Sequence, residues 1–368
     1  MAYNSPARAY LARMSPERPA PRINALATAV PASECNERYG DWARRQLGER
    51  EAALLERMLH RSGIGNRYTV LSEDDTHQAA GSFYAPPEPP GTAARMAVYA
   101  DKAPELALQA IRQLEGLDQV THLVVASCTG FTAPGLDQVI ARRLGLAPTV
   151  ERTVIGFMGC YAGVTALRSA AHIVRANPGA RVLVVAVELC SLHLQPTDRL
   201  DSLLAMAQFA DGAAAAMITG EGAGLALGEG LSLTLEDSHD LITWTIGDTG
   251  FAMELSGEVP GRLADALSNG AAQTITGGAP VSAIDGWAVH PGGRSIVDAV
   301  ERGLALPPDK LAASREVLHE FGNMSSATVL FVLKQLMAER PSNGIALAFG
   351  PGLAMEGLRF GWIEGDAG

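Results

Sequence analysis

Residues 154–164 read VIGFMGCYAGV. An apolar run ends in a glycine-bounded turn, the thiol of Cys160 follows directly, and small and apolar residues then begin a helical pattern. The start of a helix offers unpaired backbone N–H groups and the positive end of the helix dipole, which favour an anion. We therefore expect the pKa of Cys160 to lie below the free value of about 8.5, as in a nucleophile. The alternative is a small buried hydrophobic residue, since free cysteines are among the most buried residue types.

The composition is that of a globular protein, with 368 residues of which 47% are hydrophobic and 19% are charged. This length allows one large core or two fused domains. The net charge of −11 argues against nucleic acid as the main partner. No apolar run reaches the roughly 18 residues that would cross a bilayer, so we expect no membrane span.

Four cysteines are too few and too scattered for a disulfide framework: Cys35, Cys128, Cys160 and Cys190. None lies in a CxxC pair or a Cys/His cluster, so we expect no metal site. Unpaired thiols suit a reducing compartment, which predicts a cytoplasmic protein.

The first part of the chain predicts an irregular arm, a strand and a long helix. Residues 1–22 contain several prolines and arginines and form the arm, and 23–32 form the strand. Apolar residues repeat with helical spacing over 37–61, which predicts one helix. Arg57 and Arg61 are four residues apart, so they share a face of that helix and create a basic spot. The alternative is an ordinary solvated face.

From residue 120 onward, strands and helices alternate, as in an α/β fold. The second half of the chain repeats the first at a constant offset of 163 residues. Under this offset Ser127 falls on His290 and Cys160 falls on Asn323; glycines and prolines match too, at Gly130 and Gly293 and at Pro178 and Pro341.

The duplication predicts an arm at 1–22, an N-terminal half at 23–222 with Cys160, and a C-terminal half at 223–368 with His290 and Asn323. Two similar α/β halves packed about a pseudo-two-fold axis can bring equivalent turns together at their seam. We therefore expect Cys160, His290 and Asn323 to meet there, although they are far apart in the sequence.

These three residue types suit acyl chemistry at a thiol. A thiolate attacks thioesters, and a nearby imidazole stabilises it and transfers protons. An amide N–H and an imidazole N–H together stabilise negative charge on an oxygen, such as that of an enolate. Papain-like hydrolases also use Cys, His and Asn, but there the Asn orients the His. Asn323 instead opens its own helix after Gly322, which favours an independent donor aimed at the substrate.

Four motifs resemble the type III polyketide synthases, the chalcone synthase relatives with the thiolase fold: GFMGCYAG around Cys160, WAVHPGG around His290, GNMSSATVLFVL from Gly322, and AFGPG from Ala348. The resemblance implies a homodimer of αβαβα subunits that uses an acyl-CoA starter and malonyl-CoA, with no cofactor or metal. By that resemblance Cys160 carries the starter and the growing chain. His290 and Asn323 promote decarboxylation of malonyl-CoA and hold the enolate oxygen.

The same resemblance assigns lesser sites. Arg57 and Arg61 match positions that contact CoA phosphates, and Gly292 and Ser295 match positions where the backbone meets pantetheine. Phe209 matches the aromatic gatekeeper between the CoA tunnel and the cavity, whereas the second gatekeeper position holds Met253. The remaining cavity positions are Cys128, Cys190, His193, Trp244, Ser325 and the loop Gly350, Pro351 and Gly352.

Several cavity positions depart from the plant enzymes, which usually have Thr or Gly at Cys128, Cys190, His193 and Trp244. The large ring of Trp244 is expected to shorten the cavity or redirect it. Bacterial relatives with similar motifs suggest an alkylpyrone or alkylresorcinol product. The starter, the number of extensions and the cyclisation mode stay open.

Two alternatives accompany this interpretation. A ketoacyl synthase III-like enzyme of fatty acid synthesis shares the three residues and the fold, but it extends once from an acyl carrier protein; GNMSS and AFGPG argue against it. A catalytically silent thiolase-fold protein that acts through dimeric interaction is the second alternative, disfavoured because all three catalytic residue types are present.

Overall fold

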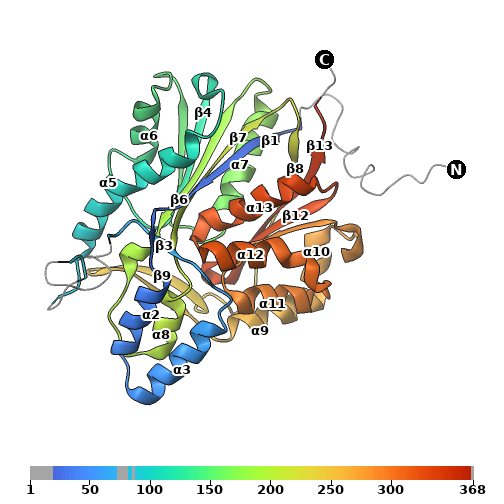
Figure 1. The fold of residues 1–368 in the computed structure, drawn as a ribbon. Helices are drawn as coiled ribbons and strands as arrows, with labels where there is room; N and C mark the ends of the chain where they lie inside the picture. Colours follow the sequence, from blue (N-terminus) through green and yellow to red (C-terminus); the bar gives the residue numbers. More distant parts are fainter. Residues whose placement is uncertain (1–19, 73–81, 85–87, 366–368) are drawn as a thin grey trace.

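The computed structural model describes residues 20–72, 82–84 and 88–365, so most of the arm expected at 1–22 lies outside the described residues. A nine-stranded sheet crosses the molecule in the order β11-β12-β13-β8-β1-β7-β6-β4-β5 (Figure 1). Its strands are β1 (Arg22–Ala29), β4 (His122–Ser127), β5 (Glu151–Gly156), β6 (Val182–Leu189), β7 (Asp211–Thr219), β8 (Gly224–Thr234), β11 (Gly286–Val289), β12 (Gly344–Gly350) and β13 (Ala354–Ile363).

The sheet repeats one strand arrangement on either side of its centre, where β1 and β8 pair antiparallel through Ile23 and Leu225. Outward from β1 the order is β7, β6, β4, and outward from β8 it is β13, β12, β11. In both parts the outer of these strand pairs, β6–β4 and β12–β11, is parallel. The pair inside it, β7–β6 or β13–β12, is antiparallel. The repeat is incomplete: where the offset predicts a counterpart of β5, the chain forms helix α12 (Ala312–Phe321).

Helices form three layers around the two parts of the sheet. The buried helices α7 (Ala162–Ala176) and α13 (Thr328–Glu339) share one core with strands of both parts. On the outer faces, α5 (Thr92–Ile111) and α6 (Leu136–Leu144) pack on the first part, and α9 (Val259–Ala266) and α11 (Arg294–Gly303) pack on the second. The αβαβα layering predicted from the sequence is confirmed.

A close approach at Gly163 joins the two inner helices. A Cβ on this residue would lie 2.2 Å from the carbonyl oxygen of Ser326, in the short helix η6 (Ser325–Ala327) that leads into α13. Only glycine lets the first turn of α7 pack so closely on η6. Because Cys160 lies two residues before α7 and Asn323 lies two residues before η6, this contact sets the distance between the two matched turns.

Four smaller elements gather at one end of the molecule: α2 (Asn36–Arg45), α3 (Glu49–His60), α8 (Leu200–Met206) and the hairpin of β9 (Ile242–Gly247) with β10 (Gly250–Leu255) (Figure 1). The single helix predicted over 37–61 is wrong. Gly48 has extended backbone angles (φ −70°, ψ 161°) and breaks it into α2 and α3. The remaining elements are β2 (Ser33–Glu34), β3 (Tyr68–Thr69), α10 (Ala272–Thr276) and the short helices η1 (Leu117–Gln119), η2 (Cys190–His193), η3 (Leu267–Ala271), η4 (Val281–Ala283), η5 (Pro308–Leu311) and η7 (Pro351–Leu353).

The side chains of the described ranges, 20–72, 82–84 and 88–365, bear on two features, a membrane span and a metal site. None of their helices is both long and apolar enough to cross a membrane. Within the same ranges, no three His, Cys, Asp or Glu side chains gather in a way that could hold a metal ion.

Candidate active site

The turn before Cys160 packs tightly against the loop that follows β12. Gly159 has a left-handed backbone (φ 90°), and a Cβ there would lie 2.3 Å from Cδ of Pro351. Gly350 also lies close to this turn, since a Cβ there would lie 3.3 Å from the backbone nitrogen of Cys160. These contacts place Gly350 and Pro351 beside the candidate nucleophile, where they limit the space around it.

Asn323 is buried and its carboxamide has a fixed orientation. Its Oδ1 accepts a hydrogen bond from the Ser325 backbone N–H at 2.8 Å, and its Nδ2 donates to the Gly292 carbonyl at 3.0 Å. The side chains of Asn323 and Ser325 also reach the Cys160 thiol and act on it as hydrogen-bonding groups. The amide oxygen is thus turned toward Ser325 and one N–H toward Gly292, which leaves the second N–H for this pocket.

His290 is almost wholly buried, at 1% exposure, and neither ring nitrogen has a hydrogen-bond partner. Gly292 connects it to Asn323: the Gly292 N–H donates to the His290 carbonyl at 3.0 Å, and a Cβ on Gly292 would lie 3.6 Å from Nε2 of His290. The structure therefore links His290, Asn323 and Cys160 through consecutive contacts. Among the described residues, no hydrogen bond joins His290 directly to Cys160.

Burial shifts both titratable groups toward their neutral forms. It raises the pKa of the Cys160 thiol to about 11, with a smaller contribution from the Glu188 carboxylate, and it lowers the pKa of His290 to about 3. The expectation that the helix start lowers the pKa of Cys160 is therefore wrong for this site. Loss of water around a fully buried thiol outweighs the helix dipole.

Glu188 is a buried carboxylate that the sequence reasoning missed. It accepts hydrogen bonds from the Cys128 backbone N–H at 2.9 Å, from the Thr129 hydroxyl at 2.8 Å and from the Ser326 hydroxyl. Burial raises its pKa to about 7. Glu188 thus ties the end of β4 to η6 and fixes the seam between the two turns. An acidic residue near the end of the apolar strand 181–188 was the available signal.

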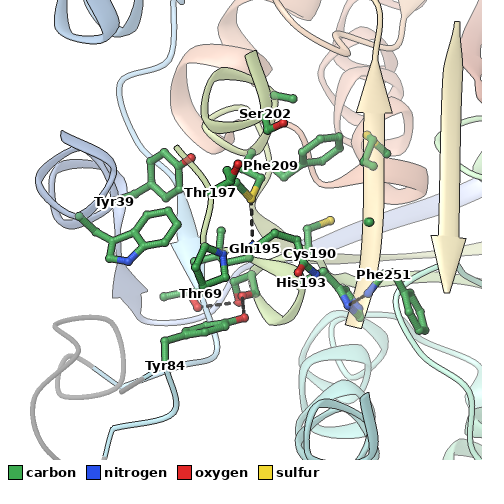
Figure 2. Close-up of a pocket in the computed structure, with 18 of the residues that line it drawn as sticks. Tyr39, Thr69, Tyr84, Cys190, His193, Gln195, Thr197, Ser202, Phe209 and Phe251 are labelled. Atoms are coloured by element: carbon green, nitrogen blue, oxygen red, sulfur yellow. Dashed lines mark hydrogen bonds between the residues drawn. The ribbon is translucent and has the colours of Figure 1, made fainter. Parts of the chain in front are cut away.

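A pocket of about 330 Å³ opens between α2, α8 and the β9–β10 hairpin (Figure 2). Five predicted cavity residues line it: Cys190, His193, Phe209, Trp244 and Met253. Phe209 also pairs through its backbone with Asn323, so the pocket begins next to the seam where Asn323 and Cys160 meet. The other predicted cavity residues do not line it. Ser325, Gly350 and Pro351 lie beside Cys160, and the Cys128 sulfur accepts the Gly159 N–H at 3.0 Å.

His193, Trp244 and Phe251 form a packed aromatic wall on one side of this pocket. His193 stacks on Phe251 with ring centroids 4.2 Å apart, and Trp244 meets both rings edge-on. His193 accepts the Phe251 N–H at Nδ1 (3.1 Å) and therefore donates from Nε2 to the Thr129 carbonyl (2.7 Å). The Trp244 indole N–H donates to the Cys128 carbonyl at 3.1 Å. These bonds fix Trp244 as part of a rigid wall.

The predicted CoA residues lie outside the pocket. Arg57 and Arg61 are exposed at the end of α3, and the Arg61 carbonyl accepts a hydrogen bond from Arg294 at 3.1 Å. That bond brings the start of α11, with exposed Ser295, beside Arg61, whereas Gly292 lies nearer the catalytic seam. Arg294 is a third exposed cation here that the sequence reasoning missed, although it lies between two predicted positions.

A buried thiol, an imidazole and an oriented carboxamide on matched turns of a duplicated αβαβα fold define a thiolase-fold acyltransferase. Residues 17–222 match the N-terminal domain of chalcone and stilbene synthases, and residues 226–361 match the C-terminal domain. The chain belongs to this family, the type III polyketide synthases.

Individual relatives and a solved structure agree with this family assignment. The chain is 35% identical over 299 residues to the alpha-pyrone synthesis polyketide synthase-like Pks18 of Mycobacterium tuberculosis, covering 75% of each chain. It is 32% identical to bisdemethoxycurcumin synthase of Oryza sativa, over 83% of this chain and 82% of that one. The crystal structure of PKS-I from the brown alga Ectocarpus siliculosus superimposes with a TM-score of 0.85 at 31% identity, over 94% of this chain and 99% of that one.

Proposed function

We propose that Cys160 takes the acyl group of a CoA starter, and that His290 and Asn323 support its extension by decarboxylative condensation with malonyl-CoA. The observation that carries this proposal is the fixed carboxamide of Asn323. Its oxygen is held by the Ser325 N–H and one amide N–H by the Gly292 carbonyl, so the second amide N–H faces the thiol pocket, where an enolate oxygen would form.

The first step needs a thiolate, which burial alone disfavours. His290 accepts the Cys160 proton, and the resulting imidazolium and thiolate stabilise each other as a pair. The thiolate attacks the starter thioester carbonyl, the C–S bond to CoA breaks, and the leaving CoA thiolate takes the proton that His290 holds. The acyl group is then bound to Cys160.

The second step forms the carbon–carbon bond. The carboxylate carbon of malonyl-CoA leaves as CO₂, and its electron pair remains as an enolate whose oxygen is held by N–H groups of Asn323 and His290. The enolate carbon attacks the acyl carbonyl on Cys160, and the sulfur leaves as a thiolate. Repetition and cyclisation give the product, which we assign to the alkylpyrones or alkylresorcinols.

Arg57, Arg61 and Arg294 supply positive charge for the CoA phosphates, next to Ser295. No cofactor beyond the CoA thioesters is needed for these steps, because the thiol, imidazole and carboxamide supply the nucleophile, the proton acceptor and the enolate contact. We place the boundary between the halves at the turn after β7, at residues 222 and 223. A cytoplasmic location agrees with four free, buried cysteines.

Strand β5 offers a surface for a homodimer. It lies at the end of the sheet with most of its residues exposed. Val154 on this strand is 53% exposed, and Phe131, which lies close to Gly156, is 46% exposed. An open strand edge has unpaired backbone N–H and C=O groups that can pair with a second copy. Light scattering should give a molar mass twice that of the monomer. Val154→Lys should lower this mass toward that of a single chain. Ile246→Lys, at a residue 51% exposed on β9, is the matched control.

Product analysis by mass spectrometry tests the function. The protein is incubated with a panel of acyl-CoAs and with malonyl-CoA or malonyl-carrier protein as extender. We expect polyketide products with malonyl-CoA and several condensations per starter. A single condensation that requires the carrier protein would instead support the ketoacyl synthase III-like alternative.

A further inference from the structure

Arg67 is a buried cation directly before β3, and it is 2% exposed. Its Nε donates to Oδ1 of Asn36 at 2.8 Å. Its Nη1 donates to the carbonyls of Phe209 at 2.9 Å and Met206 at 3.4 Å. The guanidinium lies 4.6 Å from the ring centre of Tyr39, and the buried Nη2 has no hydrogen-bond partner among the described residues. None of these acceptors is a carboxylate, so a nonpolar side chain would cost less at a position that only fills the core.

Two contacts of Arg67 fall on the immediate neighbours of Asn323. Phe209, whose carbonyl accepts the Nη1 bond, pairs with Asn323 through flanking backbone hydrogen bonds of 2.8 and 2.9 Å. Gly322 precedes Asn323 with a left-handed backbone (φ 68°), and a Cβ on it would lie 2.8 Å from Cγ of Arg67. The aliphatic part of Arg67 thus packs against Gly322 while its guanidinium holds Phe209. One side chain therefore fixes the backbone of Asn323 from two sides.

A second set of contacts holds Arg67 itself. Nδ2 of Asn36 donates to the Gly65 carbonyl at 3.0 Å, and the Gly65 N–H donates to the His319 carbonyl at 2.8 Å. His319 lies on α12, the helix that ends two residues before Asn323. The segment that carries Arg67 is therefore tied to the same helix that leads into Asn323.

We propose that Arg67 is a positioning residue for the decarboxylation of malonyl-CoA, because it holds Asn323 where its N–H meets the enolate oxygen. The inference rests on the proposed function and adds a residue to one of its steps. Acylation uses Cys160 and His290, and Arg67 has no hydrogen bond to either of them in the described ranges. Loss of the Arg67 contacts should therefore slow decarboxylation more than acylation. A displacement of about 1 Å at a reacting group can lower a rate by roughly 100-fold.

Arg95 provides a matched control, since it is equally buried and similarly bonded. It is 0% exposed, and its Nε and Nη1 donate to backbone carbonyls. Its guanidinium lies over the ring of Tyr84, and its Nη2 also has no hydrogen-bond partner within the described residues. None of these hydrogen bonds reaches a neighbour of Asn323.

The test measures two partial reactions of the full chain: CO₂ release from malonyl-CoA, and formation of the acyl adduct on Cys160 from hexanoyl-CoA. Lysine keeps the charge but presents all its donors from one nitrogen. We expect Arg67→Lys to lower the rate of CO₂ release by roughly tenfold or more and to leave adduct formation within about twofold. Arg95→Lys should leave the ratio of the two rates at the parent value. The inference is overturned if Arg67→Lys releases CO₂ at the parent rate, or if both variants change the two rates in the same proportion.

Asn36→Ala is a milder variant that removes only the acceptor of the Arg67 Nε. It carries the test if thermal unfolding shows that Arg67→Lys does not fold. CO₂ release should then fall by a smaller factor while adduct formation is kept, and an unchanged ratio of the two rates would overturn the inference. The proposed function fails in a different way, when the parent protein neither releases CO₂ from malonyl-CoA nor forms product with any starter.

Discussion

Two buried histidines, His193 and His290, differ in the hydrogen bonds of their ring nitrogens. His193 is 4% exposed and uses both ring nitrogens, one toward the Thr129 carbonyl and one toward the Phe251 N–H. His290 is 1% exposed and uses neither. Buried polar atoms are normally paired, and an unpaired one lowers stability. The contrast assigns His193 to the structure of the pocket wall and leaves His290 free for substrate and for the thiol.

The same division extends to matched positions of the duplication. Ser127, which the offset places on His290, accepts a hydrogen bond from the Tyr99 hydroxyl at 2.7 Å. In the first half, the side chain at the end of the strand, Ser127, is therefore hydrogen-bonded. In the second half, the matched side chain, His290, has no hydrogen-bond partner within the described residues. A buried polar side chain without a hydrogen-bond partner is expected at a functional site.

The largest loss of activity is expected from removing the sulfur of Cys160. Cys160→Ala should lower polyketide formation by more than about 1,000-fold, because the sulfur that carries the acyl chain is lost. Mass spectrometry of products provides the measurement, and circular dichroism shows that the fold is kept. Product formation at the parent rate would remove Cys160 from the mechanism.

Next in size is the loss of the unpaired histidine. His290→Ala should lower product formation by roughly 100- to 10,000-fold, since proton transfer and one enolate contact are lost together. Its melting temperature should fall little, because no hydrogen bond is removed. A large loss of stability with nearly normal activity would reverse the roles of the two histidines.

The paired histidine should show the opposite pattern. His193→Phe leaves the Thr129 carbonyl and the Phe251 N–H without partners, so we expect a loss of about 2 kcal/mol or more in the free energy of unfolding. Activity with acetyl-CoA should change far less than in His290→Ala. Urea unfolding measures the stability, and an unchanged midpoint would contradict the structural role of His193.

Acid should weaken the parent protein through the same residue. Burial lowers the pKa of His193 from its ordinary 6.5 to about 4. The unfolded chain then binds a proton that the folded chain refuses, so this contribution to stability is present above pH 6.5 and is lost as the pH falls toward 4. The stability difference between the parent and His193→Phe should shrink over that range. A constant difference would show that the folded protein accepts the proton.

The sequence predicted the features that depend on a repeated pattern. The offset placed Cys160 and Asn323 on equivalent turns, and the structure has both turns at the joined starts of α7 and η6. The offset did not predict helix α12 in place of a counterpart of β5. Matched residues in the flanking segments do not show whether the segment between them folds in the same way in both halves. The break at Gly48 was missed because a single glycine within helical spacing is compatible with a continuous helix.

The features that escaped prediction depend on contacts between distant segments. The pocket lining combines residues of α2 and β3 with Tyr84, which no local pattern relates. The pairing of His193 likewise depends on a carbonyl at residue 129 and an amide at residue 251. The raised pKa of Cys160 reflects burial in the folded protein, which the helix start alone could not show.

The central claim is that groups of the second half act on the substrate while Cys160 carries it, and the partial reactions of Asn323→Ala test this most directly. CO₂ release from malonyl-CoA is measured together with the intact mass of the protein after exposure to an acyl-CoA. We predict that decarboxylation falls by roughly 100- to 1,000-fold while the acyl adduct on Cys160 still forms. Decarboxylation at the parent rate, or loss of the adduct alone, would contradict the account.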